Sequence, residues 1–345
     1  MALPTRRLGT TGPEISVIGF GAWAIGGGDW PYGWGPSNDE ESIAAILYAL
    51  DAGLTWIDTA PVYGYGRSEE VIGAALRLVS PSARPLVFTK CGVLWDVADR
   101  FKDSTNTLAP ASIRAECEDS LRRLGIEVID LLQFHWPDRV GTPVEDSWGE
   151  AVRLRDEGKV RHIGVCNFGV DLLERCEAVA HVETLQVPFS LIRRETAFEL
   201  LGWSINHGTG VLVYSPMQAG LLTGRFTAER AAALPRDDHR RSNPEYQEPL
   251  FARNLALVDR LRPVAERHGT SLGALAISWT LAWSGVTGAI VGARDPDQVR
   301  DWIGAPAVRL SADDLAEIAR AVQESGAGGG PTMPNGTAMT APAES

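Results

Sequence analysis

Residues 54–90 read LTWIDTAPVYGYGRSEEVIGAALRLVSPSARPLVFTK and contain one complete strand–helix–strand unit. The short apolar runs Leu54–Ile57 and Leu86–Thr89 are typical of buried strands. The segment Glu69–Leu78 between them predicts a helix, with acidic residues in its first turn, where the helix dipole favours them. Parallel strands need a crossover connection of this kind. The stretch therefore predicts an α/β protein with a parallel sheet.

The same unit recurs along almost the whole chain. We predict about eight strands, at Ile15–Phe20, Leu54–Ile57, Leu86–Thr89, Ile129–Phe134, His162–Val165, Thr184–Val187, Val211–Tyr214 and Thr287–Val291. This count favours a single (β/α)8 TIM barrel over a doubly wound open sheet, because no glycine run completes a dinucleotide fingerprint and no Walker loop is present. We expect the barrel to occupy residues 1–323. Residues 324–345 are rich in Gly, Pro, Thr and Ala and are expected to form a disordered tail.

Charge and composition narrow the possible functions. The chain has 32 Lys and Arg against 44 Asp and Glu, a net charge of −12. It lacks the basic excess that nucleic acid or an anionic membrane surface requires, so we expect neither as a partner. The first residues contain no apolar signal core and no run is long enough for a membrane helix, so we expect a cytoplasmic protein. The four Cys and six His show no metal-ligand spacing, so no metal is expected, and the oligomeric state stays open.

Polar side chains follow three successive predicted strands. Asp58 and Tyr63 come after the second strand, Lys90 ends the third, and His135 follows the fourth. The C-terminal ends of barrel strands share one mouth, so these side chains should meet there. An ammonium lowers the pKa of a neighbouring phenol, so Tyr63 could protonate a carbonyl oxygen while His135 orients that carbonyl. Singly, Asp58 could cap a turn, Tyr63 could pack in a loop and His135 could be an ordinary half-buried histidine, but the constellation favours a catalytic site.

Several short motifs resemble those of a known family. They are Asp58–Gly64 (DTAPVYG), Thr89-Lys90, Phe134–Asp138 (FHWPD), Gly164–Phe168 (GVCNF), Gln186, Tyr214–Arg225 (YSPMQAGLLTGR), Val291–Arg294 (VGAR) and Asp297–Val299 (DQV). In order and spacing, across nearly the whole predicted barrel, they resemble the signatures of the aldo-keto reductase family. The pattern Gly21-x-Trp23-x-x-Gly26-Gly27 and a Trp95 soon after the lysine are most similar to its bacterial branch of general-stress and sugar-related reductases.

This resemblance implies both a fold and an activity. The fold is a (β/α)8 barrel with a β-hairpin at its bottom, here at Thr5–Leu8 and Ile15–Val17, and the activity is that of an NADP(H)-dependent oxidoreductase without a metal. It implies that Tyr63 is the proton donor, tuned by Lys90 and Asp58, and that His135 orients the substrate. The resemblance also implies the residues that bind the cofactor. At the nicotinamide end, Asn167 and Gln186 would hold the carboxamide and Tyr214 would stack on the ring, and the other implied cofactor-binding residues are Ala22, Trp23, Asp58 and Cys166. The residues around the pyrophosphate would be Ser215, Pro216, Met217, Gln218 and Gly220, with Leu222, Gly224 and Arg225 beside it, and those around the adenosine 2′-phosphate would be Gly292, Ala293, Arg294 and Gln298.

The chain departs from the family pattern at two positions. Cys166 stands where the family usually has Ser, which weakens one hydrogen bond to the carboxamide. Trp302 stands where an Asn near the adenine is common, so Trp302 either stacks on the base or simply packs.

The abundant tryptophans suggest an apolar substrate wall. We expect Trp23, Trp95 and Trp136 to line the substrate pocket, whereas Trp30 and Trp34 could equally be core residues. In the polar insertion between Leu222 and Leu250, we expect the segment Arg236–Arg241 to form a solvated face rather than a lid.

These features favour an NADP(H)-dependent reductase of aldehydes, ketones or sugar carbonyls acting on a small molecule. One alternative is a cofactor-binding regulatory subunit resembling the β subunits of potassium channels. Another is a hydrolytic barrel that pairs Asp58 with a second carboxylate, but it leaves Lys90, Asn167 and Gln186 without a role.

Overall fold

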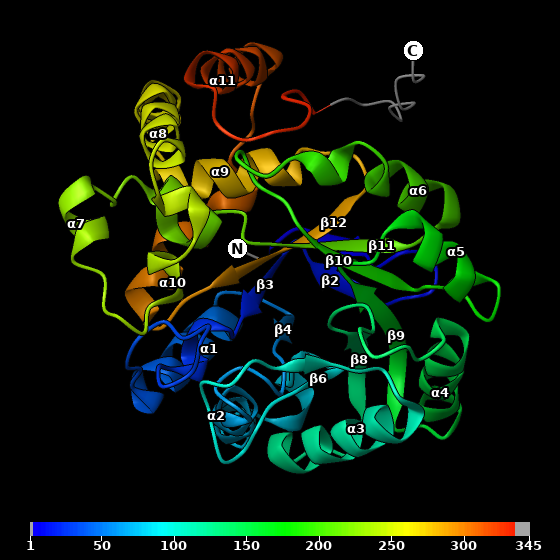
Figure 1. The fold of residues 1–345 in the computed structure, drawn as a ribbon. Coiled ribbons are helices and arrows are strands. Elements are labelled where there is room, and N and C mark those ends of the chain that lie inside the picture. Colours follow the sequence, from blue (N-terminus) through cyan, green and yellow to red (C-terminus); the bar gives the residue numbers. More distant parts are fainter. Residues whose placement is uncertain (1–2, 335–345) are drawn as a thin grey trace.

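The computed structural model describes residues 3–334 and consists of a closed parallel barrel surrounded by helices (Figure 1). Around the ring the strands follow the order β10-β11-β12-β3-β4-β5-β8-β9. Their bounds are β3 (Ile18–Gly21), β4 (Trp56–Asp58), β5 (Leu86–Cys91), β8 (Ile129–Phe134), β9 (Val160–Cys166), β10 (Thr184–Pro188), β11 (Gly210–Tyr214) and β12 (Val286–Gly292). The predicted (β/α)8 barrel is confirmed.

Helices surround the barrel. They are α1 (Asp39–Asp51), α2 (Arg67–Leu76), α3 (Pro110–Leu124), α4 (Val144–Asp156), α5 (Val170–Glu177), α6 (Leu200–His207), α7 (Ala228–Ala232), α8 (Leu250–Arg267), α9 (Leu272–Leu281), α10 (Pro296–Trp302) and α11 (Ala312–Ser325). Most pack on the strands of the barrel or on neighbouring helices, whereas α8 and α11 pack on each other in an outer layer and α7 has no buried residue. All ten residues of α9 are buried, because this helix lies between the barrel and the outer helices α8 and α10. Within residues 3–334, no helix is long and apolar enough to cross a membrane.

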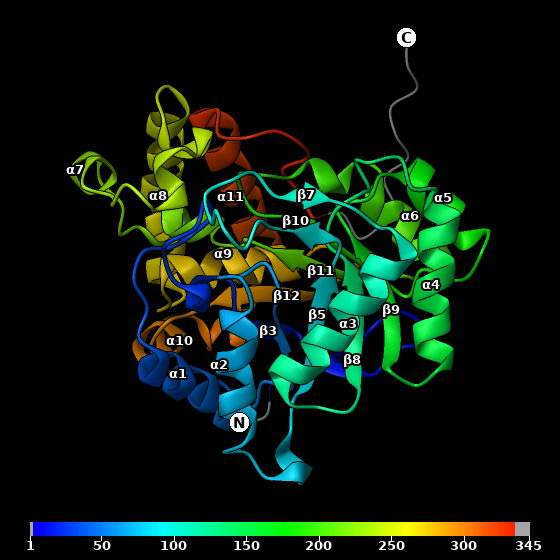
Figure 2. The same cartoon turned by 60° about the horizontal axis from the view of Figure 1, so that its bottom comes forward.

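A hairpin closes the bottom of the barrel. Strands β1 (Thr5–Arg7) and β2 (Glu14–Ser16) pair antiparallel. Figure 2 shows β7 (Thr105–Asn106), which pairs antiparallel with β6 (Val93–Leu94), above β10 and β11. The predicted strand Ile15–Phe20 is divided here between β2 and β3. The Ser16 hydroxyl donates to the carbonyl oxygen of Ile18 (2.7 Å) where the chain leaves the hairpin.

Large apolar side chains fill the lower interior of the barrel. Trp56 is fully buried and its indole N–H donates to the carbonyl oxygen of Ser16 (2.8 Å), so the ring is tied to the hairpin. Gly19 makes room for this ring, since a Cβ there would lie 2.3 Å from it. The cluster around Trp56 comprises Leu8, Ile15, Phe88, Leu131, Leu212 and Ile290. With the bottom filled, the space open to ligands lies at the C-terminal ends of the strands.

The C-terminal segment differs from the prediction of a disordered tail over 324–345. Helix α11 ends at Ser325, and Ala327 beyond it is buried against the barrel. Arg194 donates to the carbonyl oxygen of Ala327, and Gly329 forms a parallel bridge with Arg193. Residues 327–330 therefore pack on the loop that follows β10, which composition alone did not indicate. Residues 335–345 of the predicted tail lie outside the described residues.

Candidate active site

The side chains predicted to meet at the mouth of the barrel do so around Lys90. The Lys90 ammonium donates to Asp58 Oδ1 (2.6 Å), to the carbonyl oxygen of Thr59 (2.8 Å) and to the Tyr63 hydroxyl (3.4 Å). The His135 ring lies edge-on to the Tyr63 ring, with centroids 5.7 Å apart. Strand register explains the pairing, because β4 and β5 run parallel with Asp58 beside Phe88, two residues before Lys90.

Burial sets the charge states of this cluster. Burial alone would lower the pKa of Lys90, but the Asp58 carboxylate raises it above its ordinary value, so the ammonium stays charged. Burial raises the pKa of Tyr63 to about 12 although Lys90 opposes the shift. The expectation of a lowered phenol pKa is therefore wrong for the free protein, because it counted the ammonium and omitted desolvation. Burial, and then Lys90, lower the pKa of His135 well below its usual range, so its imidazole is neutral.

A network of amides adjoins the cluster. Gln186 donates through Nε2 to Asp58 Oδ2 (2.8 Å). Asn167 adopts a left-handed backbone (φ +62°), donates through Nδ2 to the carbonyl oxygen of His135 (3.1 Å), and accepts from the Tyr214 hydroxyl (2.9 Å). These contacts between residues distant in sequence were not predicted. They fix the orientation of both amides.

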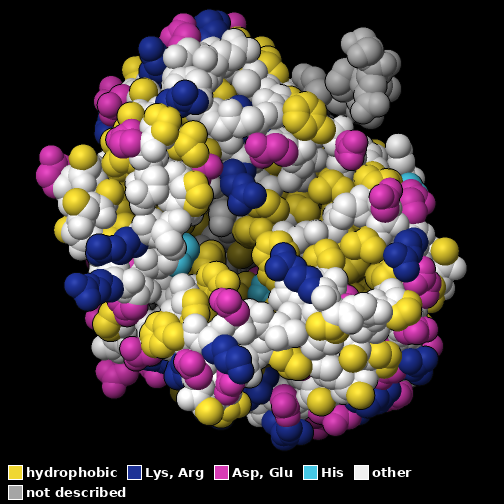
Figure 3. Space-filling model, in the orientation of Figure 1, with side chains coloured by type: hydrophobic (Ala, Val, Ile, Leu, Met, Phe, Trp, Pro, Cys, Tyr) yellow, Lys and Arg dark blue, Asp and Glu magenta, His cyan; other side chains and the backbone are white. Residues whose placement is uncertain are grey.

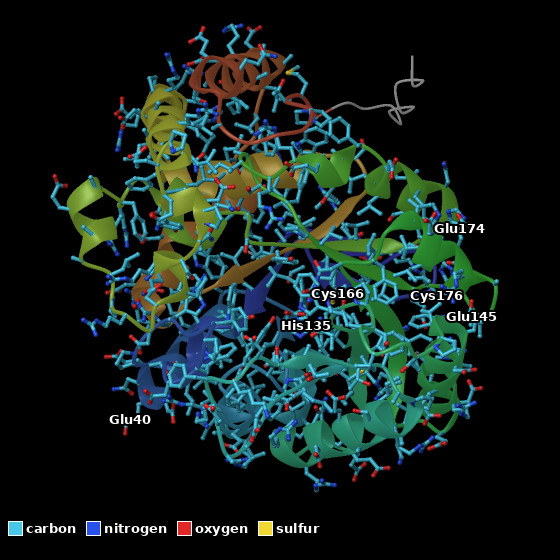
Figure 4. All side chains as sticks on the ribbon, in the orientation of Figure 1. Glu40, His135, Glu145, Cys166, Glu174 and Cys176 are labelled. Carbon is cyan, nitrogen blue, oxygen red and sulfur yellow. The ribbon has the colours of Figure 1, made fainter. Side chains whose placement is uncertain are left out.

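Two further buried residues lie behind the network. Gln133 is fully buried in β8 and its Oε1 lies 3.4 Å from Gln186 Nε2. Sequence reasoning missed Gln133, although a polar residue between Leu132 and Phe134 was a usable signal. Cys166 is buried at the end of β9, and burial raises the pKa of its thiol, so it stays uncharged. Figure 4 places Cys166 and His135 near the centre of the barrel, whereas Cys176 lies at its outer edge.

A cavity of about 1020 Å³ extends from Tyr63 and His135 to Arg294 and Gln298. Figure 3 shows it as a hollow at the mouth, with hydrophobic side chains inside and Lys or Arg side chains on two sides. Most residues predicted to bind a cofactor line it: Ala22, Trp23, Asp58, Asn167, Gln186, Tyr214, Ser215, Pro216, Met217, Gln218, Gly220, Arg225, Gly292, Ala293, Arg294 and Gln298. Lys90, Cys166, Leu222 and Gly224 do not line it.

The loop after β11 forms one wall of this cavity in an unusual conformation. Ser215, Gln218 and Ala219 are non-glycine residues with φ near +50°, a region that costs about 1 kcal/mol or more for most residues. The Tyr246 hydroxyl donates to the carbonyl oxygens of Gln218 (3.2 Å) and Ala219 (2.9 Å). These bonds hold the strained turn along the cavity.

Tryptophans line the cavity, but not all of those predicted. Trp23 and Trp136 line it as expected, and so do Trp30, Trp34 and Trp302. Trp95 does not, because its ring stacks on Tyr65 (centroids 5.0 Å apart) outside the cavity. The prediction for Trp95 is corrected accordingly.

The segment Arg236–Arg241 is not the solvated face that we expected. The His239 ring lies 4.6 Å from that of Trp23 and 4.5 Å from that of Trp34, at the edge of the cavity. Asp238 is buried, pairs with Arg240, and forms an antiparallel bridge to Trp34. Arg240 also lies over the Trp34 ring. Aromatic stacking and a buried ion pair therefore dock this segment over the mouth, although Arg236 and Arg241 at its ends are exposed.

Within residues 3–334, no group of three or more His, Cys, Asp or Glu side chains could hold a metal ion. The site instead offers a charged ammonium, a protonated phenol, a neutral imidazole and two fixed amides around one cavity. Such a set can polarise a carbonyl and give it a proton.

Known proteins resemble this chain throughout its length. A profile of the "Aldo/keto reductase family" matches residues 17–323. Aldo-keto reductase YhdN of Bacillus subtilis is 37% identical over 309 residues, covering 89% of this chain and 90% of that protein. The NADH-specific methylglyoxal reductase of Escherichia coli is 33% identical over 330 residues, covering 92% and 98%. The structure of the glycerol dehydrogenase AKR11B4 from Gluconobacter oxydans has a TM-score of 0.85 at 36% identity, covering 99% of this chain and 100% of that chain.

Replacing Asp58→Asn should destabilise the protein strongly. The substitution leaves the buried Lys90 ammonium without an anion, and breaking a buried ion pair from one side costs about 3–5 kcal/mol. The free energy of unfolding is measured by urea titration. The matched control is Asp96→Asn, which removes the carboxylate from an exposed pair with Lys102 and should change stability far less. Equal losses in the two variants would contradict a dominant role for the buried pair.

Proposed function

Because the chain belongs to the aldo/keto reductase family, we propose that it is an NADP(H)-dependent reductase of aldehyde, ketone or sugar carbonyls in which Tyr63 is the proton donor. The observation that carries this proposal is the contact of the Lys90 ammonium with both Asp58 and the Tyr63 hydroxyl at the base of a large cavity. That arrangement suits proton donation to an oxygen that gains negative charge.

The chemistry of the cavity residues fits a nicotinamide cofactor. A carboxamide needs one donor and one acceptor, and Gln186 spends its amide nitrogen on Asp58, which leaves its carbonyl oxygen to accept. Asn167 would hold the other side of the carboxamide, and the Tyr214 ring offers a flat surface beside it. When bound, the nicotinamide supplies or accepts a hydride at the substrate carbon.

The other end of the cavity fits an anionic group. Arg294 donates to the carbonyl oxygen of Trp34 (3.1 Å), and Arg225 pairs with Asp301 nearby. The planar guanidinium of Arg294 suits a phosphate dianion, which favours NADP(H) over NAD(H). The proposed preference for NADP(H) differs from that of the Escherichia coli relative, whose name states specificity for NADH.

In the proposed mechanism, the side chains divide the work of carbonyl reduction. The substrate oxygen would lie between the Tyr63 hydroxyl and the His135 ring, which is neutral and can donate a single N–H. Tyr63 gives its proton to this oxygen as the carbon is reduced, and Lys90 stabilises the resulting phenolate. Asp58 keeps Lys90 charged throughout. Tryptophan rings around the cavity exclude water, which strengthens each of these interactions.

A hydrolytic mechanism is disfavoured by the same contacts. Both oxygens of Asp58 are engaged, one by Lys90 and the other by Gln186, so neither is free to activate water. The other carboxylates in the described cavity lining are Asp103, in the loop beyond β6, and Asp301, which pairs with Arg225.

Replacing Tyr63→Phe should lower turnover of an aldehyde with NADPH by about 100-fold or more, because the proton donor is lost. NADPH binding, followed by quenching of tryptophan fluorescence, should stay close to that of the unmodified protein. The control is Tyr65→Phe, since the Tyr65 hydroxyl donates to the carbonyl oxygen of Arg100 outside the cavity lining. Unchanged turnover in the Tyr63 variant would rule out this residue as the donor.

The pH profile of reduction should be flat in the neutral range. The pKa of Tyr63 lies at about 12 and that of His135 well below its usual range, so neither group titrates between about pH 6 and about pH 9. Oxidation of an alcohol needs the Tyr63 phenolate, whose population rises with pH, so its rate should increase across the same range. The measurement is kcat/KM in both directions. A reduction rate that falls with a midpoint near neutrality would contradict these charge states.

Replacing Arg294→Ala should raise the KM for NADPH by about tenfold or more and leave the KM for NADH nearly unchanged, since one charge-assisted hydrogen bond contributes about 1.5–3 kcal/mol. Arg300→Ala is the control, because Arg300 lies on α10 and pairs with Asp297 away from the cavity lining. Equal KM shifts for both cofactors would show that Arg294 does not read the 2′-phosphate.

A further inference from the structure

In the part of the chain that the structure describes, two arginines at the mouth of the cavity have no partner for their guanidinium groups. Arg139, in the loop after β8, and Arg193, in the loop after β10, line the same cavity as Tyr63 and His135. Among residues 3–334, neither side chain makes a hydrogen bond or an ion pair. In a chain with a net charge of −12, two cations left free beside one cavity call for an explanation.

The other arginines of the cavity lining are engaged. Arg225 pairs with Asp301, Arg240 pairs with Asp238, and Arg294 donates to the carbonyl oxygen of Trp34. Arg230 donates to the carbonyl oxygen of Arg225. Arg139 and Arg193 therefore differ from the other arginines of the lining in two respects. Their guanidinium groups make no hydrogen bond or ion pair among residues 3–334, and they lie near the proton-donor end of the cavity.

The backbone of Arg193 is held by the segment beyond α11. Arg193 forms a parallel bridge with Gly329, and the amide of Arg194 donates to the carbonyl oxygen of Gly329 (3.2 Å). The Arg194 guanidinium is buried and binds the carbonyl oxygens of Leu191 and Ala327. On the other side, the Ser190 hydroxyl accepts from the amide of Arg193 (3.0 Å). The main chain is thus fixed while the Arg193 side chain remains exposed at the cavity.

The backbone of Arg139 is held in a comparable way. Its amide donates to the carbonyl oxygen of Asn106 (3.0 Å) in β7. The preceding Asp138 accepts from four backbone amides, those of Leu108, Val140, Gly141 and Thr142, at 2.7–2.9 Å. Burial would raise the pKa of Asp138, but these donors lower it, so the carboxylate stays charged and the turn stays closed. Each arginine is therefore presented from a rigid turn, which reduces the entropy lost when a ligand is bound.

We propose that the carbonyl substrate carries a phosphate or carboxylate group, which Arg139 and Arg193 hold at the mouth while the carbonyl reaches Tyr63. This inference rests on the proposed reductase function and specifies its substrate class. Trp136, which lies on the same loop as Arg139, lines the cavity and is 38% exposed, would pack against the carbon chain that joins the two ends. Asp103 is the acidic residue in this part of the described lining, and it weakens the attraction for an anion without cancelling two positive charges.

The first experiment compares matched pairs of substrates on the full-length protein with NADPH. We expect kcat/KM for glyceraldehyde 3-phosphate to exceed that for glyceraldehyde by about tenfold or more, as expected for hydrogen bonds to a charged group. The pair succinic semialdehyde and butanal tests the carboxylate in the same way. Whichever anionic member shows the larger gain identifies the group, and no gain in either pair would overturn the proposal.

The second experiment changes the arginines. Arg139→Gln and Arg193→Gln should each lower kcat/KM for the preferred anionic substrate about tenfold, mainly through KM, and leave the neutral member of the pair within about twofold. Arg320→Gln removes the same charge from the exposed face of α11 and should change neither. Asp103→Asn should lower KM for the anionic substrate. Equal losses for charged and neutral substrates would indicate a structural role and contradict the proposal.

Binding without turnover separates this inference from the proposed function. Glycerol 3-phosphate, with NADP⁺ present to occupy the Arg294 end, should bind the unmodified protein at least about tenfold more tightly than either arginine variant, as measured by calorimetry. If no carbonyl is reduced but this difference is found, the anion site stands and the reductase proposal fails. If neutral aldehydes are reduced through Tyr63 and glycerol 3-phosphate binds all variants equally, the reductase proposal stands and the anion site fails.

Discussion

A buried ammonium is the constraint on which the rest of the site depends. The side chain of Lys90 is fully shielded from water, and a charge in that position persists only with an anion and further hydrogen bonds around it. Asp58 supplies the anion, the carbonyl oxygen of Thr59 accepts a second hydrogen bond, and Tyr63 completes the set. Because Asp58 also accepts from Gln186, the same ion pair fixes an amide from the opposite side of the barrel. The geometry of the whole mouth is therefore coupled to one pair of charges.

The barrel provides the low-polarity surroundings that make this pair effective. Its lower interior is filled by Trp56 and the cluster around it, and the hairpin β1–β2 closes the bottom. Water therefore reaches Lys90 only past the cavity, where tryptophans and the segment around His239 cover much of the approach. Desolvation then acts on both neighbours of the ammonium. It raises the pKa of Tyr63 and lowers that of His135, so the phenol keeps its proton and the imidazole stays neutral.

The sequence predicts those parts of the structure that depend on local pattern and strand geometry. Eight apolar runs separated by helical segments predicted the barrel, and their ends brought Asp58, Lys90 and His135 to one mouth. Contacts between loops could not be predicted from these patterns. His239 reaches Trp23, and Ala327 reaches Arg194, only through loop conformations that no periodicity encodes. The prediction for the pKa of Tyr63 was wrong for a different reason. The direction of its shift depends on whether burial or the Lys90 ammonium has the larger effect, and the degree of burial is a property of the folded chain.

The acidic composition of the chain and the arginines at its mouth act over different distances. At physiological ionic strength charges are screened beyond about 8 Å, so most of the net charge of −12 is not felt inside the cavity. Local groups therefore decide what binds there, and most acidic side chains near the mouth are already neutralised by a partner. Asp58 is paired with Lys90, Asp238 with Arg240 and Asp301 with Arg225, so the remaining local charge is positive. A chain with a negative net charge can therefore still favour a small anion in one cavity, because such an anion lies within the screening length of the two guanidinium groups that have no partner among residues 3–334.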